Sequence, residues 1–143
     1  MNQSYDPELL TERQVADLLA GAERYAPVGG EVEARQLETP RTWVTARGQE
    51  LQAEAGDWLV TSGNDQWTVV GDIFAKTYQQ VGPGRFAKTA KVEAVQVPKL
   101  IRVKTLEGEA VAHAGDWLLR GVSGEVWPVT HPIFVERYRL IKP

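Results

Sequence analysis

The chain has 143 residues, of which 43% are hydrophobic and 24% are charged, and its formal net charge is −3. These values are typical of a globular protein with a substantial core, and they provide no broad positive field to attract nucleic acid or an anionic membrane. The chain contains no cysteine, which excludes disulfides, thiolate nucleophiles and cysteine-ligated zinc.

The first predicted element is an amphipathic helix over residues 6–24. Asp6 followed by Pro7 suits the N-cap and the first helical position. Apolar residues recur at helical spacing along one face: Leu10, Val15, Leu18, Leu19 and Ala22. The phrase LTERQVADLLA also resembles the opening helix of some helix-turn-helix DNA-binding domains, but a strand pattern follows instead of a second helix. We therefore do not expect a DNA-binding domain.

The start of the chain, MNQSYDPELL, lacks the basic region and apolar run of a signal peptide. No apolar stretch approaches the ~20 residues that would cross a bilayer. We expect a cytoplasmic protein that does not associate with membranes.

Two stretches of the chain match each other closely enough to predict an internal duplication. The matched residues are Val32-Glu33-Ala34 with Val92-Glu93-Ala94, Gly56-Asp57-Trp58-Leu59 with Gly115-Asp116-Trp117-Leu118, Trp67 with Trp127, Ile73-Phe74 with Ile133-Phe134, and Tyr78 with Tyr138. Chance would rarely place tryptophan at the same point twice over so short a span. The sequence therefore predicts two tandem copies of one strand-rich module.

Each copy has the pattern of several short strands and one short helix. The predicted strands are 32–37, 42–46, 58–61 and 79–81 in the first copy, and 92–97, 100–106, 117–120 and 139–141 in the second. A short helix precedes each closing strand, begun by Asp72 in one copy and by Pro132 in the other. The predicted organisation is an N-terminal helix and linker over 1–30, a first repeat over 31–81, a linker over 82–90 and a second repeat over 91–143.

The two copies are expected to form one compact domain of the α+β class that is mostly β. A module this small cannot bury enough surface alone, so the copies should pack on each other about a pseudo-two-fold axis. The N-terminal helix is expected to cover an exposed sheet face or edge. If the protein has a pocket, the cleft between the copies is its natural place.

Most of the matched residues suit a structural role. Large aromatic side chains supply much of the buried area of a small module, and those predicted for the core are Trp58, Trp117, Phe74, Phe134, Tyr78 and Tyr138. In the Gly-Asp pairs, the glycine is expected to supply a backbone shape that a side chain would forbid. Asp57 and Asp116 are expected to bond to the amides of their own turns, with paired site carboxylates as the alternative.

The sequence contains few groups that indicate catalysis. Its two histidines, His113 and His131, show no HxH or HExxH spacing, and Ser62 and Ser123 lack a Gly-x-Ser-x-Gly context. The glycine-containing stretch 81–85 does not suit a phosphate cradle, because its proline has no amide proton. We expect no catalytic residue, no metal site and no cofactor.

Basic residues collect in the middle of the chain. Arg102 and Lys104 alternate on one predicted strand and so share a face, and Arg85 precedes them. Trp67 and Trp127 follow polar loops and should lie nearer the surface than the other aromatic residues. These five residues form the candidate binding set for a small anionic ligand, with a solvated strand face as the alternative. Nucleic acid is not an expected partner.

The second copy resembles a family of small phage and prophage proteins built around a GD-aromatic motif, of the PGDYG type. The residues that carry the resemblance are Val92-Glu93-Ala94-Val95-Gln96, Thr105-Leu106-Glu107-Gly108-Glu109, Gly115-Asp116-Trp117-Leu118-Leu119-Arg120-Gly121-Val122, Ile133-Phe134 and Tyr138. They cover most of 91–141, and the first copy follows the pattern more loosely over 32–81. The chain departs from it at Ala55 and Ala114, where a proline often precedes the glycine. The resemblance implies little about function.

An aromatic core with few catalytic groups favours a non-enzymatic interaction or accessory protein, of phage or host origin, whose partner is another protein. The alternative is a small-molecule or nucleotide binder that uses the cleft between the repeats. A cleft lined by Arg85, Arg102 and an exposed tryptophan would favour the binder, and an exposed apolar patch away from any cleft would favour a protein partner.

Overall fold

The computed structural model describes residues 7–28, 30–44 and 50–141. The protein is mostly β, with three short helices in the described residues, and the predicted α+β class is confirmed. No helix of the described ranges is long and apolar enough to cross a membrane.

After the N-terminal helix α1, the elements follow one another in the same order in the two halves of the chain. The first half contains α1 (Glu12–Leu19), β1 (Glu23–Pro27), β2 (Glu31–Gln36), β3 (Arg41–Val44), β4 (Glu50–Ala53), β5 (Trp58–Ser62), β6 (Asp65–Val69), α2 (Gly71–Thr77) and β7 (Tyr78–Gly82). The second half contains β8 (Arg85–Lys88), β9 (Val92–Gln96), β10 (Ile101–Thr105), β11 (Gly108–Ala112), β12 (Trp117–Arg120), β13 (Val126–Val129), α3 (His131–Arg137) and β14 (Tyr138–Leu140).

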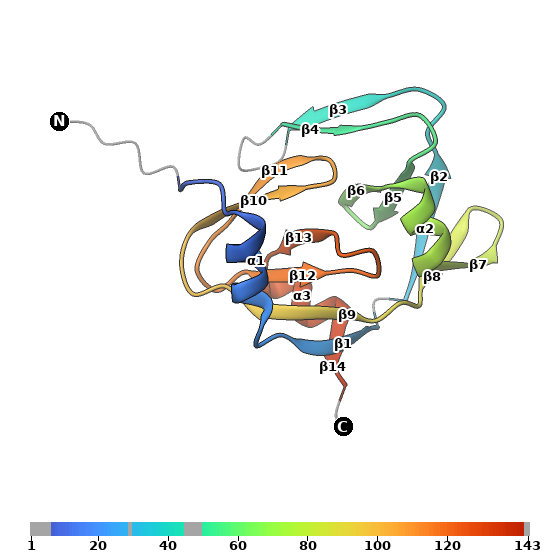
Figure 1. Cartoon of the computed structure of the whole chain (residues 1–143). Helices are drawn as coiled ribbons and strands as arrows, with labels where there is room; N and C mark the ends of the chain where they lie inside the picture. The colour runs from blue at the N-terminus through green and yellow to red at the C-terminus, as the bar shows by residue number, and fades with distance from the viewer. Residues whose placement is uncertain (1–6, 29, 45–49, 142–143) are drawn as a thin grey trace.

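Two five-stranded antiparallel sheets and two hairpins make up the fold (Figure 1). The first sheet has the order β6-β5-β2-β8-β7, and the second sheet has the order β13-β12-β9-β1-β14. These orders correspond position by position when β2 is matched with β9 and β8 with β1. The hairpins β3–β4 and β10–β11 occupy matching places in the two halves. The origin of this likeness in an internal duplication stays a prediction.

The strand that leads into each half pairs with the sheet of the other half. β1 precedes β2 in sequence, yet it lies between β9 and β14. β8 precedes β9, yet it lies between β2 and β7. The segment 82–90, expected to be a linker, therefore contains a central strand. The β7–β8 turn, Pro83 and Gly84, provides the glycine-rich pattern that suggested a linker.

Helix α1 is shorter than the predicted 6–24. It begins after Thr11, whose hydroxyl accepts from the Gln14 N–H while the Gln14 side chain accepts from the Thr11 N–H. This reciprocal pair fixes the helix start five positions after the cap expected at Asp6, which lies outside the described residues. Residues 23 and 24 belong to β1 because their backbone pairs with β9.

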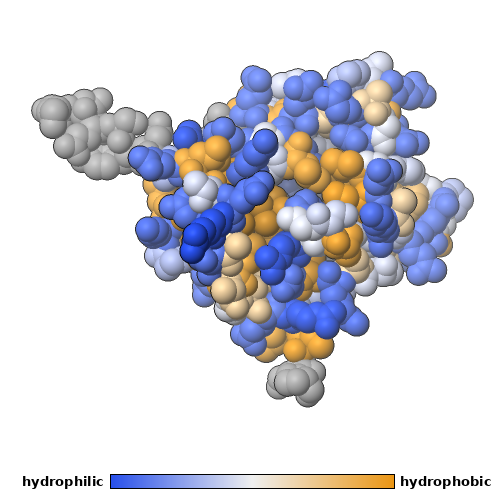
Figure 2. All heavy atoms as spheres, in the orientation of Figure 1, coloured by the Kyte–Doolittle hydropathy of each residue, from blue (hydrophilic) through white to orange (hydrophobic). Residues whose placement is uncertain are grey.

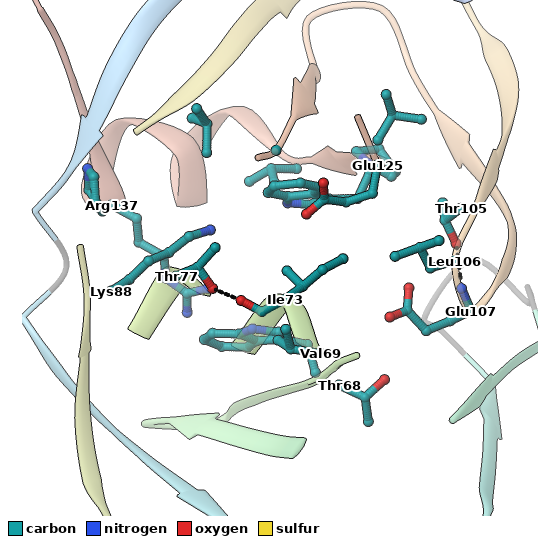
Figure 3. A pocket seen from close by; sticks show the side chains of 18 of the residues that line it. Thr68, Val69, Ile73, Thr77, Lys88, Thr105, Leu106, Glu107, Glu125 and Arg137 are labelled. Atoms are coloured by element: carbon teal, nitrogen blue, oxygen red, sulfur yellow. Dashed lines mark hydrogen bonds between the residues drawn. The ribbon is translucent and has the colours of Figure 1, made fainter. Parts of the chain in front are cut away.

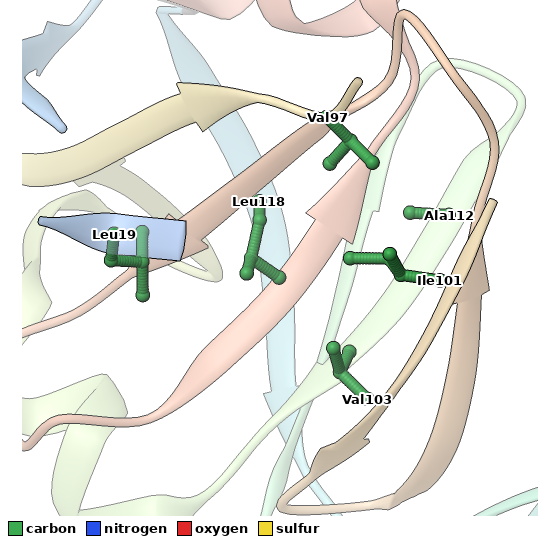
Figure 4. Packing of buried hydrophobic residues seen from close by; sticks show 6 residues of the cluster. All are labelled: Leu19, Val97, Ile101, Val103, Ala112 and Leu118. Carbon is green, nitrogen blue, oxygen red and sulfur yellow. The ribbon is translucent and has the colours of Figure 1, made fainter. Parts of the chain in front are cut away.

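A buried aliphatic cluster holds α1 on the second half. Leu19 and Leu118 are 2% and 0% exposed, and Figure 4 shows them facing residues of β10 and β11. The cluster comprises Leu19, Val97, Ile101, Val103, Ala112 and Leu118. The matching cluster of the first half is smaller and comprises Leu37, Ala53 and Leu59. The helix therefore adds core to one half only.

Aromatic stacks form the remaining core of each half. In the first half Phe74 stacks on Trp58 and on Tyr78, with ring centroids 4.2 and 4.6 Å away. In the second half Phe134 stacks on Trp117 at 4.0 Å and on Tyr138 at 5.3 Å. Both phenylalanines and Tyr138 are buried as predicted, whereas the two tryptophans and Tyr78 are half-buried at the edges of the clusters.

The repeated Gly-Asp pairs build matching turns, as predicted. Gly56 and Gly115 have φ angles of +95° and +93°, a region that strongly favours glycine. Asp57 Oδ2 accepts from the Glu54 N–H, and Asp116 Oδ2 accepts from the His113 N–H, each at 2.9 Å. These aspartates therefore serve the backbone of their own turns.

Candidate functional site

A cavity of about 450 Å³ lies between the two sheets, beneath the two hairpins. Its lining includes pairs of matched residues from the two halves: Trp67 with Trp127, Val69 with Val129, Ile73 with Ile133, and Tyr78 with Tyr138. The face drawn in Figure 2 has a hollow near its centre, with hydrophobic residues around it and hydrophilic residues further out. The cavity therefore has walls of similar composition on both sides.

The hairpins meet over the cavity through a close backbone contact. The Gln52 N–H donates to the Glu107 carbonyl at 2.8 Å. A Cβ at Gly108, whose φ is +145°, would lie 2.9 Å from the Glu50 carbonyl oxygen. Only glycine fits both this backbone conformation and this approach. The contact places Leu51 of one hairpin and Leu106 and Glu107 of the other against the same cavity.

Lys88, the last residue of β8, carries a cation into the cavity among aromatic rings. Its Nζ donates to the Tyr138 hydroxyl at 2.9 Å and lies 4.9 Å from the centroid of the Trp127 ring. The rings of Tyr138 and Tyr78 are 5.4 and 6.0 Å away. Burial lowers the pKa of this amine, and among the described residues no carboxylate forms an ion pair with it. The rings offset only part of the cost of desolvating the charge.

Arg137, at the end of α3, brings a second cation to the same side of the cavity (Figure 3). Its guanidinium donates to Asp65 Oδ2 at 3.1 Å and lies 4.5 Å from the centroid of the Trp67 ring. This pair links the second half to β6 of the first half. Because Asp65 forms its ion pair with Arg137, it does not pair with the Lys88 ammonium.

Burial raises the pKa of the Tyr138 phenol to about 12. The phenol is therefore protonated at neutral pH, and its O–H can donate to an acceptor while its oxygen accepts from Lys88. Tyr138 thus extends the group of donors at this side of the cavity.

Glu107 lies on the opposite side of the cavity from Lys88 and Arg137 (Figure 3). It occupies the turn between β10 and β11, where burial, assisted by the charges of Asp57 and Glu125, raises its pKa to about 7. A carboxyl with this pKa changes between hydrogen-bond donor and acceptor near neutral pH.

Thr68 contributes a hydroxyl without a partner. The residue is 8% exposed and lines the cavity from β6, and its Oγ1 makes no hydrogen bond within the described part of the chain. A buried hydroxyl without a partner costs free energy. A ligand atom that bonded to it would remove that cost.

The structure brings together two of the five residues predicted to bind a ligand. Trp67 and Trp127 line the cavity, whereas Arg85, Arg102 and Lys104 do not. Arg85 pairs with Glu31 at 3.0 Å, and Arg102 pairs with Glu109 at 3.6 Å. Lys104 is exposed on β10, as the solvated-strand alternative expected.

Neither cation of the cavity was among the predicted ligand-binding residues, and for Lys88 the reason is that the glycine- and proline-containing pattern of 82–90 indicates a linker. In a strand, Lys88 shares a face with Phe86, and the apolar Phe86 would have indicated that this face points inward. Arg137 immediately precedes the matched Tyr138, where the first half has Thr77. A charged residue at only one of two matched positions is the sequence signal that could have indicated a functional role for Arg137.

Within the described residues, no group of three histidine or acidic side chains could hold a metal ion. Comparisons of the chain with models of protein families, with curated proteins and with solved structures find no match. The resemblance to GD-aromatic phage proteins therefore stays a prediction.

Proposed function

We propose that the protein binds a small organic molecule in the cavity between its two sheets. The observation that carries this proposal is the cavity itself: about 450 Å³, with mostly apolar walls and a few inward polar groups. Sites for small molecules typically have ~300–1,000 Å³ and this kind of lining. The proposal corresponds to the alternative that the sequence left open.

The energetics of the cavity support a ligand. Among the described residues the Lys88 amine has no carboxylate partner and the Thr68 hydroxyl has no hydrogen-bond partner, and burying such groups costs free energy. A bound molecule would recover part of this free energy. The proposed role is binding without chemistry, consistent with our expectation that the protein is not an enzyme.

The competing hypothesis is the protein-interaction role that the sequence favoured. Exposed large apolar side chains include Val44 at 62% and Val135 at 47%, and they lie on different elements. The same experiment can separate the two roles, because filling the cavity should abolish ligand binding and leave an outer surface intact.

The test compares two substitutions on one helix. Ile133 of α3 lines the cavity, whereas Val135 of the same helix is exposed and does not. We expect N-phenyl-1-naphthylamine, a neutral apolar fluorescent probe, to gain fluorescence with the wild type and with Val135→Trp. Ile133→Trp should abolish that gain because the indole fills the cavity.

Native mass spectrometry and thermal unfolding with nucleotides and organic acids then test for natural occupants. A ligand at a hundred times its Kd should raise the free energy of unfolding by about 2.7 kcal/mol. Equal probe fluorescence in the wild type and Ile133→Trp, together with no ligand-dependent shift in the wild type, would contradict the proposal.

A further inference from the structure

We infer that the molecule bound in the cavity is an organic acid, with its anionic group beside Lys88 and Arg137 and an apolar body between Ile73 and Ile133. This inference rests on the proposed function, because it assigns the chemistry of the molecule bound at the same site. It is carried by the distribution of charge and of apolar surface within the cavity.

The first step concerns the charge of Lys88, which forms no ion pair with an acid of the described residues. Lys88 and Arg137 both line the cavity, and the pKa of Lys88 is lowered mainly by burial and to a smaller extent by the charge of Arg137. Asp65 pairs with Arg137 alone. Two cations on one side of a largely apolar cavity with a single paired acid favour an anion from outside the chain.

The second step concerns Glu125, the carboxylate whose charge acts on Lys88. Glu125 also lines the cavity, but its Oε1 accepts from the Ser123 N–H at 2.9 Å in its own turn. It forms no ion pair with Lys88 within the described residues. The position beside the ammonium therefore stays open to a carboxylate or phosphate.

The third step concerns donor geometry. Lys88 gives one of its protons to the Tyr138 oxygen, which leaves the others for a ligand. The protonated Tyr138 hydroxyl provides one more donor, and Arg137 has further N–H groups beyond the one that meets Asp65. Several convergent donors around one position are what an oxyanion binds.

The fourth step concerns the rest of the ligand. Ile73, Ile133, Val69 and Val129 line the same cavity as the cations and Glu107. Figure 3 shows Ile73 and Val69 between the side of Lys88 and the side of Glu107. An apolar body here removes hydrocarbon surface from water on both partners. The ligand should therefore be amphipathic, with its charge at one end.

The test uses two probes with the same apolar body. 8-Anilinonaphthalene-1-sulfonate carries an anionic group, and N-phenyl-1-naphthylamine lacks it. We expect the wild type to bind the sulfonate at least about tenfold more tightly. Lys88→Met, which keeps the length and apolar stem of the side chain, should reduce the preference to about twofold or less. Lys76→Met, an exposed change on α2 outside the cavity, should leave the preference unchanged.

Displacement of the sulfonate probe by octanoate, octyl phosphate and 1-octanol then identifies the anionic group. Competition by either anion but not by the alcohol supports the inference and distinguishes carboxylates from phosphates. Equal binding of both probes, or an unchanged preference in Lys88→Met, would overturn the inference and leave the proposed function standing. If neither probe binds the wild type, or Ile133→Trp binds both as well as the wild type, the proposed function fails with it.

Discussion

The two sheets share a strand order but differ in what their matched positions hold. Trp67 and Trp127 stand at matched positions, as do Ile73 and Ile133, and all four line the cavity. The charged groups of the cavity have no such symmetry. Lys88 ends β8 where Pro27 ends β1, and Arg137 precedes Tyr138 where Thr77 precedes Tyr78.

This difference separates two roles within one site. Matched residues provide the apolar walls and the Tyr138 hydroxyl, and unmatched residues provide the charges of Lys88 and Arg137. A third unmatched pair follows the same rule, because Thr68 faces the cavity from β6 where β13 has Pro128. The apolar walls of the cavity are therefore alike on its two sides whereas its charged groups are not, so the proposed ligand should bind in one preferred orientation.

The largest expected effect tests the difference in core size between the halves. Leu118→Ala should lower the free energy of unfolding by about 4 kcal/mol, because this leucine is fully buried under α1. Leu59→Ala should cost about 2.5 kcal/mol, because its cluster is smaller and has no covering helix. Urea unfolding of both variants measures the difference, and equal losses would show that α1 adds no stability to the second half.

The next effect is a pH dependence at the tip of β10–β11. The pKa of Glu107 in the folded state, about 7, is above its ordinary value of 4.5, so the folded state holds this proton more tightly than the unfolded chain does. The protonated carboxyl contributes fully to stability below pH 4.5. As the pH rises through about 7 this contribution is lost, and the free energy of unfolding falls by up to about 3 kcal/mol.

Glu107→Gln should remove this dependence, because the amide does not titrate. The free energies of unfolding of the wild type and the variant should therefore diverge between pH 4.5 and 8, with the wild type losing stability relative to the variant. Parallel curves in urea unfolding across this range would contradict the buried position of the carboxyl in the cavity.

A smaller effect compares two threonines of equal burial. Thr68 and Thr105 are each 8% exposed, but only the Thr105 hydroxyl is hydrogen-bonded, to the Gly108 carbonyl at 2.7 Å. Thr68→Val should raise the free energy of unfolding by about 1 kcal/mol, and Thr105→Val should lower it by a similar amount. Thermal unfolding distinguishes them, and a loss of stability in Thr68→Val would mean that its hydroxyl has a partner in solution.

The smallest effect concerns the basic residues that the sequence singled out. Arg85 and Glu31 have side chains 55% and 52% exposed, so Arg85→Ala should change stability by less than about 0.5 kcal/mol. Binding of the sulfonate probe should also stay unchanged, in contrast to Lys88→Met. A loss of probe binding in Arg85→Ala would instead support the predicted anion site that includes Arg85.

Local patterns predicted much of the fold. The matched aromatic residues identified the two cores, and the Gly-Asp pairs identified turns whose hydrogen bonds the structure shows. The aromatic half of the site was also predicted, through Trp67 and Trp127.

The exchange of β1 and β8 could not be read from local patterns. Strand exchange depends on which sheet accepts a segment, and neither Arg24-Tyr25-Ala26 nor Arg85-Phe86-Ala87 contains that information. Because the strand exchange places Lys88 at the cavity, the position of this cation could not be predicted without it. The partnerless Thr68 hydroxyl likewise depends on three-dimensional neighbours that no spacing reveals.

The position of β1 also constrains how the chain can fold while a ribosome makes it. β1 leaves the ribosome well before its partners β9 and β14. The first sheet needs nothing beyond β8 and can assemble early. Until β9 has been released, β1 has neither of its partner strands, and Leu19 of α1 has no core to pack against, because its cluster is built from residues 97–118.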